Sequence, residues 1–190
     1  MQCRRVRACV CLAAGSCYYG DMDQRDETYM ALALEEARLA AAEGEVPIGA
    51  VVVYDDRVIA RAHNRRETDR DPSAHAEFAA MLEAARVLDR WRLTGCTVYV
   101  TLEPCLMCAG LMVNARVDRC VYGAPDPKGG ALGTLYDVSH DARLNHEYLV
   151  TPGVCSAQSA EVLRAFFKER RAARKRERAE AASSDATGDA

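Results

Sequence analysis

The segment TVYVTLEPCLMC, residues 97–108, joins a strand to a helix and carries two cysteines three positions apart. Residues 97–102 form a short apolar run rich in β-branched side chains, as expected of a buried strand, and Pro104 suits the first turn of a helix. Residues three apart on a helix share a face, so Cys105 and Cys108 can bind one ion. The positive end of the helix dipole favours the thiolate form that a soft metal requires.

A second cluster, HAE at residues 75–77, begins thirty positions before Cys105. Asp71 or Ser73 can begin a helix that we expect to run to about Leu88. The cluster would then lie in the first turn of this helix. The sequence therefore predicts two helix N-termini, each carrying side chains that can ligate a metal or move a proton.

Together the two clusters supply the parts of a catalytic zinc site. His75, Cys105 and Cys108 are ligands suited to zinc, and three protein ligands leave a fourth position for water. Glu77 need only reach that water to act as a proton shuttle. The pattern H-x-E with P-C-x-x-C is the signature of zinc deaminases, so the sequence predicts a zinc-dependent hydrolase.

Other interpretations of the same residues stay open. Cys-x-x-Cys alone can be half of a structural zinc site or a redox pair, and a structural site would close with a fourth Cys or His. A zinc-stabilised RNA-binding module without catalysis is therefore the alternative from another class. The remaining histidines could still reach the metal: His63, His140 and His146.

Composition limits the class of protein further. A chain of 190 residues fits one domain, and its apolar runs fall far short of the roughly 20 residues that cross a bilayer, so we expect no membrane partner. Nine cysteines without regular spacing, two of them better explained as thiolates, favour a reducing compartment, the cytoplasm. The net charge is only -3, but residues 164–178 hold eight Lys or Arg and two Glu. Such a helix is usually a solvated face, although it can also contact phosphates.

Three parts are expected along the chain: an extension over residues 1–22, a catalytic domain over 23–178 that includes the basic helix, and a disordered tail over 179–190. The extension superficially imitates a targeting segment, and a translation start at Met22 would explain it equally well. Within the domain, Asp26 is expected to cap the first helix. The other expected elements are helices over 27–43 and 160–179, a hairpin of 46–53 and 58–62, and strands over 119–123 and 147–150. This alternation predicts an α/β layered sheet.

Further motifs resemble the bacterial tRNA-specific adenosine deaminases over about residues 26–176. They are VPIGA at 46–50, HNR at 63–65, TLEPCLMCAG at 101–110 and DPKGGA at 126–131. The resemblance implies a three-layer α-β-α fold of the cytidine deaminase type with a five-stranded mixed sheet. It also implies a homodimer with one Zn²⁺ per subunit that converts adenosine to inosine at wobble position 34 of the tRNA anticodon and releases ammonia.

The resemblance also implies a role for each matching residue. His75, Cys105 and Cys108 match the zinc ligands and Glu77 the proton donor, while Asn64 would orient the base, Ile48 would form pocket wall, and Asp126, Lys128 and Asn145 would contact anticodon nucleotides. Phe166 or Phe167 could stack beside flipped bases of the anticodon stem-loop, although such a pair is usually core. Deaminases of free guanine, cytidine or deoxycytidylate share the two metal-site clusters and remain the alternative.

Overall fold

Five strands form one mixed sheet in the computed structural model, which describes residues 19–185 and the side chains of residues 24–181. The strands are β1 (Gly49–Tyr54), β2 (Arg57–His63), β3 (Cys96–Leu102), β4 (Arg119–Ala124) and β5 (Leu149–Pro152), in the order β2-β1-β3-β4-β5. The pairs of β1 with β2 and with β3 are antiparallel, and β3, β4 and β5 are parallel. The predicted five-stranded mixed sheet is thereby confirmed.

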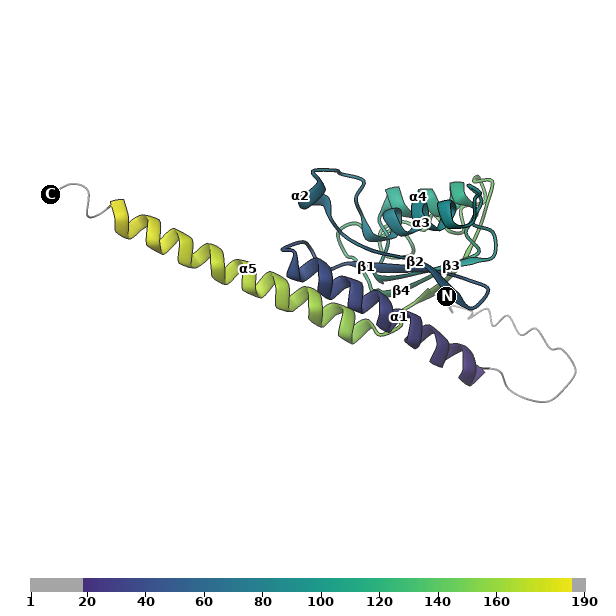
Figure 1. The fold of residues 1–190 in the computed structure, drawn as a ribbon, viewed down its shortest axis with the longest axis horizontal. Helices are drawn as coiled ribbons and strands as arrows, with labels where there is room; N and C mark the ends of the chain where they lie inside the picture. The colour runs from purple at the N-terminus through teal and green to yellow at the C-terminus, as the bar shows by residue number, and fades with distance from the viewer. Residues whose placement is uncertain (1–18, 186–190) are drawn as a thin grey trace, which may run out of the picture.

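Helices cover both faces of this sheet, which gives the predicted three-layer α-β-α fold (Figure 1). Helices α1 (Tyr19–Ala42) and α5 (Ser156–Asp185) pack on one face, and α3 (Ala76–Val87) and α4 (Leu106–Ala115) on the other. A single-turn helix, α2 (Arg66–Asp69), lies between β2 and α3. Within residues 19–185 none of the helices combines the length and apolarity needed to span a bilayer.

The central strands are apolar on both sides because each face of the sheet has its own core. Successive side chains of a strand point to opposite faces, so Val51 packs beneath α1 while Val52 packs beneath α3 and α4. Tyr99 and Val100 divide in the same way on β3. Each such fully buried side chain contributes about 1.5–3 kcal/mol, so the two cores hold the helices firmly on the sheet.

Gly49 lets helix α1 approach the first residue of β1 very closely. A Cβ atom at this position would overlap the Ala33 carbonyl oxygen and the Ala37 backbone nitrogen. Only glycine fits beneath the helix at this point. The close contact fixes the segment before β1, which contains Ile48, against the end of the sheet.

The prediction that Asp26 caps the first helix is wrong, because α1 begins at Tyr19 and Asp26 lies inside it. Asp26 is buried and forms an ion pair with Arg119, with a shortest N–O distance of 2.6 Å. Its carboxylate also accepts a hydrogen bond of 2.8 Å from the Tyr99 hydroxyl. A carboxylate paired with strands β3 and β4 holds the helix on the sheet instead of ending it.

The C-terminal helix is longer than predicted. It begins at Ser156, after Cys155 adopts a left-handed φ of 53°, and it continues through Asp185, so residues 179–185 are helical and not disordered. Residues 179–185 include three alanines and one glutamate, which favour helix even without an apolar face. Strand β5 begins two residues later than predicted because its parallel register places Leu149 opposite Arg119. Residues 19–22 of the expected extension belong to α1, and residues 1–18 and 186–190 lie outside the described part of the chain.

Candidate active site

One edge of the sheet gathers the segments that carry the predicted site. Because β1 runs antiparallel to both β2 and β3, the start of β1 lies at the same edge of the sheet as the ends of β2 and β3. The Gly49 amide donates a hydrogen bond of 3.2 Å to the Thr101 hydroxyl across this edge. Ile48 therefore precedes β1, Asn64 follows β2 and Cys105 follows β3 at the same end of the sheet.

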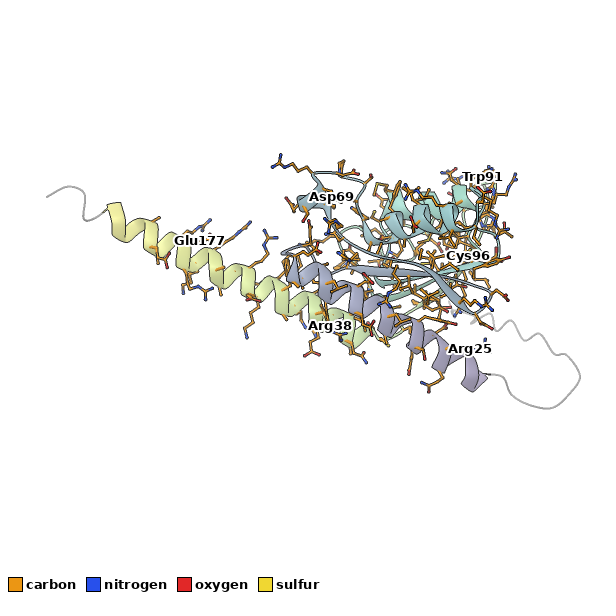
Figure 2. The ribbon with its side chains drawn as sticks, in the orientation of Figure 1. Arg25, Arg38, Asp69, Trp91, Cys96 and Glu177 are labelled. Atoms are coloured by element: carbon orange, nitrogen blue, oxygen red, sulfur yellow. The ribbon has the colours of Figure 1, made fainter. Side chains whose placement is uncertain are left out.

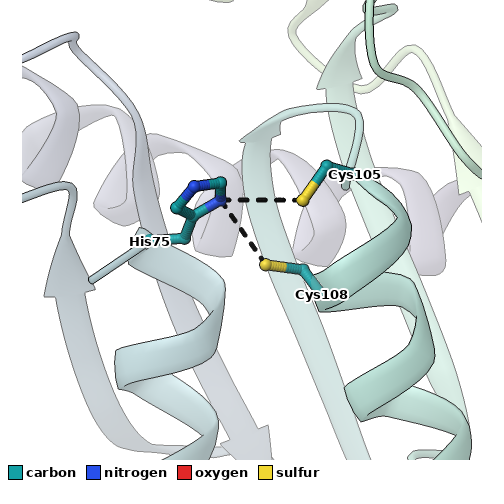
Figure 3. A group of neighbouring side chains, drawn as sticks. All are labelled: His75, Cys105 and Cys108. Atoms are coloured by element: carbon teal, nitrogen blue, oxygen red, sulfur yellow. Dashed lines mark hydrogen bonds between the residues drawn. The ribbon is translucent and has the colours of Figure 1, made fainter. Parts of the chain in front are cut away.

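His75, Cys105 and Cys108 meet at this edge (Figure 3). His75 is the N-cap of α3, Cys105 is the N-cap of α4, and Cys108 lies in the first turn of α4. The His75 Nδ1 atom lies 3.7 Å from each of the two sulfur atoms, and the three ligand atoms are all within 4.8 Å of one another. The two sequence clusters thus form a single group that could bind a metal ion.

The spacing of these atoms fits zinc. In a tetrahedral site with Zn–N of about 2.0–2.1 Å and Zn–S of about 2.3 Å, the nitrogen and a sulfur would be about 3.6 Å apart. Two sulfurs and an imidazole also suit zinc far better than magnesium or calcium, which prefer oxygen ligands. Three protein ligands are the number found in catalytic zinc sites.

No fourth protein ligand joins the group among the side chains of residues 24–181. Each of the other histidines bonds elsewhere. The Nδ1 atom of His63 lies 2.9 Å from the Glu36 carboxylate, and the Nε2 atom of His146 lies 2.7 Å from a backbone carbonyl oxygen. His140 interacts with its neighbour Ser139 at 2.8 Å.

The pKa values of the three side chains in this group are shifted in different directions. A hydrogen bond from Cys108 lowers the pKa of the Cys105 thiol to about 3, so Cys105 is a thiolate at neutral pH. The same hydrogen bond, together with burial, raises the pKa of Cys108. The hydrogen bond with Cys105 raises the pKa of His75. A negative sulfur is therefore already in place beside the ring.

Glu77 is buried beside this group, with 4% of its surface exposed. Burial raises the pKa of its carboxyl group, while the charge of His75 and a hydrogen bond with Cys108 act in the opposite direction. Side chains two positions apart on an ideal helix, such as those at 75 and 77, would point about 200° away from each other. His75, however, lies before the helix and has an extended backbone, with φ -79° and ψ 148°. Helical periodicity therefore does not separate the two side chains, and both face the same site.

Asn64 is also buried at this edge. Its backbone amide donates to the Ile48 carbonyl at 2.9 Å, and its side-chain Nδ2 donates to Glu45 Oε2 at 3.0 Å. The amide of Arg65 donates to the carbonyl of Ala74 at 3.0 Å. This backbone contact lies one residue from both Asn64 and His75, so the structure brings Asn64 and Ile48 to the metal-binding group.

Asp126 and Lys128 lie on the loop after β4, which the buried carboxylate of Glu103 holds. Glu103 accepts hydrogen bonds from the backbone amides of Asp126, Leu132 and Thr134 and from the Thr134 hydroxyl. A bridge between Cys105 and Gly130 joins the same loop to one of the candidate metal ligands. The loop therefore borders the site.

Three of the predicted contact residues remain: Asn145 lies away from the metal-binding group, and Phe166 and Phe167 differ in their exposure to solvent. Asn145 accepts a hydrogen bond of 2.5 Å from Arg116, at the opposite end of α4 from Cys105, so one subunit does not bring it to its own metal-binding group. Phe166 packs into the domain, while Phe167 is 42% exposed and contacts it edge-on. Of the two rings, only Phe167 has a free face for stacking.

Two buried carboxylates, Glu45 and Glu103, were not assigned a role from the sequence. Glu103 forms part of the motif before Cys105, and Glu45 directly precedes the apolar run that becomes β1. An acidic residue beside a buried strand, with no basic neighbour in the sequence, is the signal that could have marked each of them. Both carboxylates accept hydrogen bonds from neighbouring segments of the chain and, among the side chains of residues 24–181, do not pair with a cationic one. The sequence pattern does not show these contacts.

A group that could bind a metal and a buried carboxylate, placed at two helix N-termini on one edge of a mixed sheet, are typical of the class of hydrolytic deaminases. A family model described as MafB19-like deaminase matches residues 24–171. The tRNA-specific adenosine deaminase of Bacillus subtilis (strain 168) is 50% identical over 151 residues, which cover 80% of this chain and 94% of the relative. The chain belongs to the tRNA-specific adenosine deaminase family.

Solved structures agree with this assignment. A structure from a study of A-to-I editing by tRNA:A34 deaminases at the wobble position of transfer RNA has a TM-score of 0.70 and 47% identity, and the match covers 72% of this chain and 99% of that one. A guanine deaminase from Bacillus subtilis has a TM-score of 0.50 and 38% identity, with 52% and 64% covered. The tRNA deaminase structure is therefore the more similar of the two over a longer part of both chains.

Proposed function

We propose that this protein converts adenosine to inosine at wobble position 34 of a tRNA anticodon and releases ammonia. The observation that carries the proposal is the group of His75, Cys105 and Cys108, with Glu77 buried beside it, in a chain of this family. The reaction belongs in the cytoplasm, where tRNA is modified and cysteines stay reduced.

His75, Cys105 and Cys108 would hold one Zn²⁺ per subunit. Zinc bound there supplies a Lewis acid that lowers the pKa of a water molecule to near neutrality. Glu77 would take one proton from the attacking water onto its carboxylate and pass it to a ring nitrogen, and would then carry the second proton of that water to the leaving amine, which departs as ammonia. Its raised pKa suits this role, since a carboxyl group with a pKa nearer neutrality can both accept and donate a proton.

The edge of the sheet also provides the surfaces that a flipped base needs. Asn64 offers hydrogen bonds to the base and Ile48 forms pocket wall. Asp126 and Lys128, on the loop held by Glu103, would contact neighbouring anticodon nucleotides, and Phe167 offers a ring for stacking. An anticodon stem-loop presents unpaired bases, so no duplex has to be opened before the adenosine enters the pocket.

The basic part of α5 supports binding of the stem. By helical periodicity Arg164, Lys168, Arg171, Lys175 and Arg178 share one exposed face, which we call the α5 basic stripe. Figure 1 shows that the C-terminal part of α5 extends beyond the domain on the side where α2 lies. Because α2 follows the end of β2, this is also the side of the sheet edge that carries the site. Figure 2 shows Glu177 on the same projecting part.

Substitution of Arg171 by Ala in the α5 basic stripe is expected to weaken tRNA binding and to make it less dependent on salt. Loss of one phosphate contact lowers the slope of log affinity against log salt concentration by roughly 0.7–0.9. Fluorescence anisotropy across a salt series measures this slope. Arg176→Ala removes the same charge from another face of the helix and is the matched control; equal effects of the two variants would exclude a role for the stripe.

An exposed apolar surface on α3, on α4 and on the segment that follows α3 supports a homodimer. It includes Leu82, Trp91, Leu106 and Met107, and a groove of about 200 Å³ runs between Met81, Trp91 and Leu111. Large contiguous apolar patches on a protein surface commonly mark interfaces. A second subunit would also explain Asn145, which lies at the end of α4 opposite to its own site.

Trp91→Glu is expected to convert the dimer to a monomer, because it places a charge in the apolar interface. Trp91 is 57% exposed in one subunit and lies at the end of the molecule far from the projecting half of α5 (Figure 2). Sedimentation velocity gives the molecular mass of both proteins. Leu149→Glu, at an exposed position on β5, is the control. A Trp91→Glu variant that remains dimeric would contradict this interface.

Mass spectrometry of nucleosides from total tRNA tests the proposed reaction directly. Incubation with the purified protein is expected to produce inosine only at wobble adenosine. Parallel reactions with guanine, cytidine and deoxycytidylate test the alternative deaminases, which share the metal site. Turnover of one of these in place of tRNA would overturn the proposal, and RNA binding without any ammonia release would indicate a non-catalytic module.

A further inference from the structure

Glu45 is a buried carboxylate outside the groups assigned to the reaction. Only 1% of its surface is exposed, and both of its oxygens accept hydrogen bonds. Oε1 accepts from the backbone amide of Thr68 at 2.6 Å, and Oε2 accepts from Asn64 Nδ2 at 3.0 Å. Glu45 thus connects the segment after α1 with α2 and with a side chain of the site.

The contact with Glu45 determines how the Asn64 amide is turned. An asparagine side chain has an oxygen that only accepts and a nitrogen that donates two hydrogens, and the two ends have nearly the same shape. Because an ionised carboxylate can only accept, it pairs with Nδ2 and not with Oδ1. Within residues 24–181, no group donates a hydrogen bond to Asn64 Oδ1, so this oxygen and the second Nδ2 hydrogen remain available to a substrate.

Asn64 is placed where a substrate would meet it. Its backbone amide bonds to Ile48, in the proposed pocket wall, and the adjacent Arg65 bonds to Ala74, the residue before His75. The free edge of the Asn64 amide offers one acceptor beside one donor. Adenine presents the complementary pair, since its N6 amine donates and its N7 accepts, whereas guanine presents two acceptors at O6 and N7.

We propose that Glu45 is a positioning residue that selects adenine, because it holds Asn64 with Oδ1 directed at the N6 amine and Nδ2 at N7. The inference rests on the proposed function and names the group that sets its base specificity. Glu45 does not touch the base; it acts through Asn64.

Glu45→Gln tests the inference with little change of shape. Glutamine has one acceptor and one donor end, so it cannot accept from both Thr68 and Asn64. With its oxygen on the Thr68 amide, its NH₂ group would donate to Asn64 Oδ1 and the Asn64 amide would turn over. The order of donor and acceptor facing the base would then be reversed.

The measurement compares two anticodon stem-loops, one with adenosine and one with 7-deazaadenosine, which lacks the N7 acceptor, at the wobble position. In the unaltered enzyme, kcat/KM is expected to fall roughly 5- to 150-fold on loss of N7, the usual range for a paired base contact. In Glu45→Gln, kcat/KM for adenosine is expected to fall by a similar factor, and the two substrates should become nearly equivalent. Glu43→Gln, a nearby carboxylate that pairs with Arg65, is the matched control and should keep the discrimination.

A double-mutant cycle separates positioning from general damage to the fold. If Glu45 acts through Asn64, adding Glu45→Gln to Asn64→Ala should cause no further loss of kcat/KM. If Glu45→Gln does not fold, Glu45→Asp and Glu45→Asn give a second comparison. Aspartate keeps a carboxylate that only accepts hydrogen bonds, whereas asparagine has one donor and one acceptor end, so only Glu45→Asn should lose the discrimination. Additive losses in the cycle, or unchanged discrimination in Glu45→Gln or Glu45→Asn, would overturn the inference alone. An unaltered enzyme inactive on wobble adenosine would instead refute the proposed function, and the inference with it.

Discussion

Replacement of Glu77 by Gln is expected to lower kcat for wobble adenosine by roughly 10²- to 10⁴-fold, the usual contribution of a positioned acid-base group. The glutamine side chain keeps the shape of the buried glutamate but cannot exchange protons at neutral pH. Because His75, Cys105 and Cys108, and not Glu77, form the group that could bind a metal ion, the variant should retain bound zinc. Single-turnover kinetics with metal analysis by mass spectrometry would show both properties in one preparation.

Glu83→Gln is the matched control for this prediction. Glu83 lies on the same helix, α3, but is exposed and pairs with Arg86 at 3.1 Å. It should keep full activity, since a surface pair of this kind contributes little even to stability. If Glu77→Gln retained wild-type turnover, proton transfer would have to pass through another group, and the assignment of Glu77 would be wrong.

The metal-binding group could be predicted from the sequence because short local patterns determine it. His75 and Cys105 each precede a helix whose start is marked by nearby residues, and the spacing to Cys108 follows from one helical turn. The sequence could not show that the two helices leave the same edge of the sheet. That depends on β1 pairing with β3, a contact between residues about fifty positions apart.

The polar groups that support the site could not be predicted, because each depends on a tertiary contact. Glu45 reaches Asn64 across 19 positions and Glu103 reaches Asp126 across 23, without a periodic pattern to link them. Asp26 was placed at a helix start because aspartate is a good N-cap, but its bond to Arg119, 93 positions away, requires it inside the helix. In each case a buried carboxylate is satisfied by a partner that only the folded chain brings near.

Helix α5 shows the opposite error. The acidic, Ala- and Ser-rich end of the chain has too little apolar content for a core, which favoured a disordered tail over residues 179–190, yet the helix continues through Asp185. Alanine, arginine and glutamate lose little side-chain entropy in a helix, so local propensity can extend it where packing has ended. A helix that projects without a packing partner presents charges on all sides, and only one of its faces forms the α5 basic stripe.

Cys105→Ser is expected to abolish both zinc binding and turnover. Cys105 is the group's thiolate, with a pKa of about 3, and a serine hydroxyl does not ionise in the same way to replace it. A ligand that binds only the folded state at about 1,000 times its Kd stabilises that state by about 4 kcal/mol. For a chain of this size, loss of zinc should therefore lower the unfolding midpoint by roughly 8–16 °C, which differential scanning calorimetry can measure.

Cys155→Ser is the control, because Cys155 is free and lies outside the metal-binding group. It should keep its zinc, its midpoint and its activity. A chelator should lower the unfolding midpoints of the unaltered protein and of Cys155→Ser to that of Cys105→Ser. Added zinc should restore the midpoints of the first two proteins but should not raise that of Cys105→Ser. Because restoration requires the full set of ligands, a Cys105→Ser protein that regained a stoichiometric metal ion would show that the ion is bound elsewhere. The role of His75 and Cys108 would then fail with that of Cys105, since the 3.7 Å contacts that define the group all meet at one ring nitrogen.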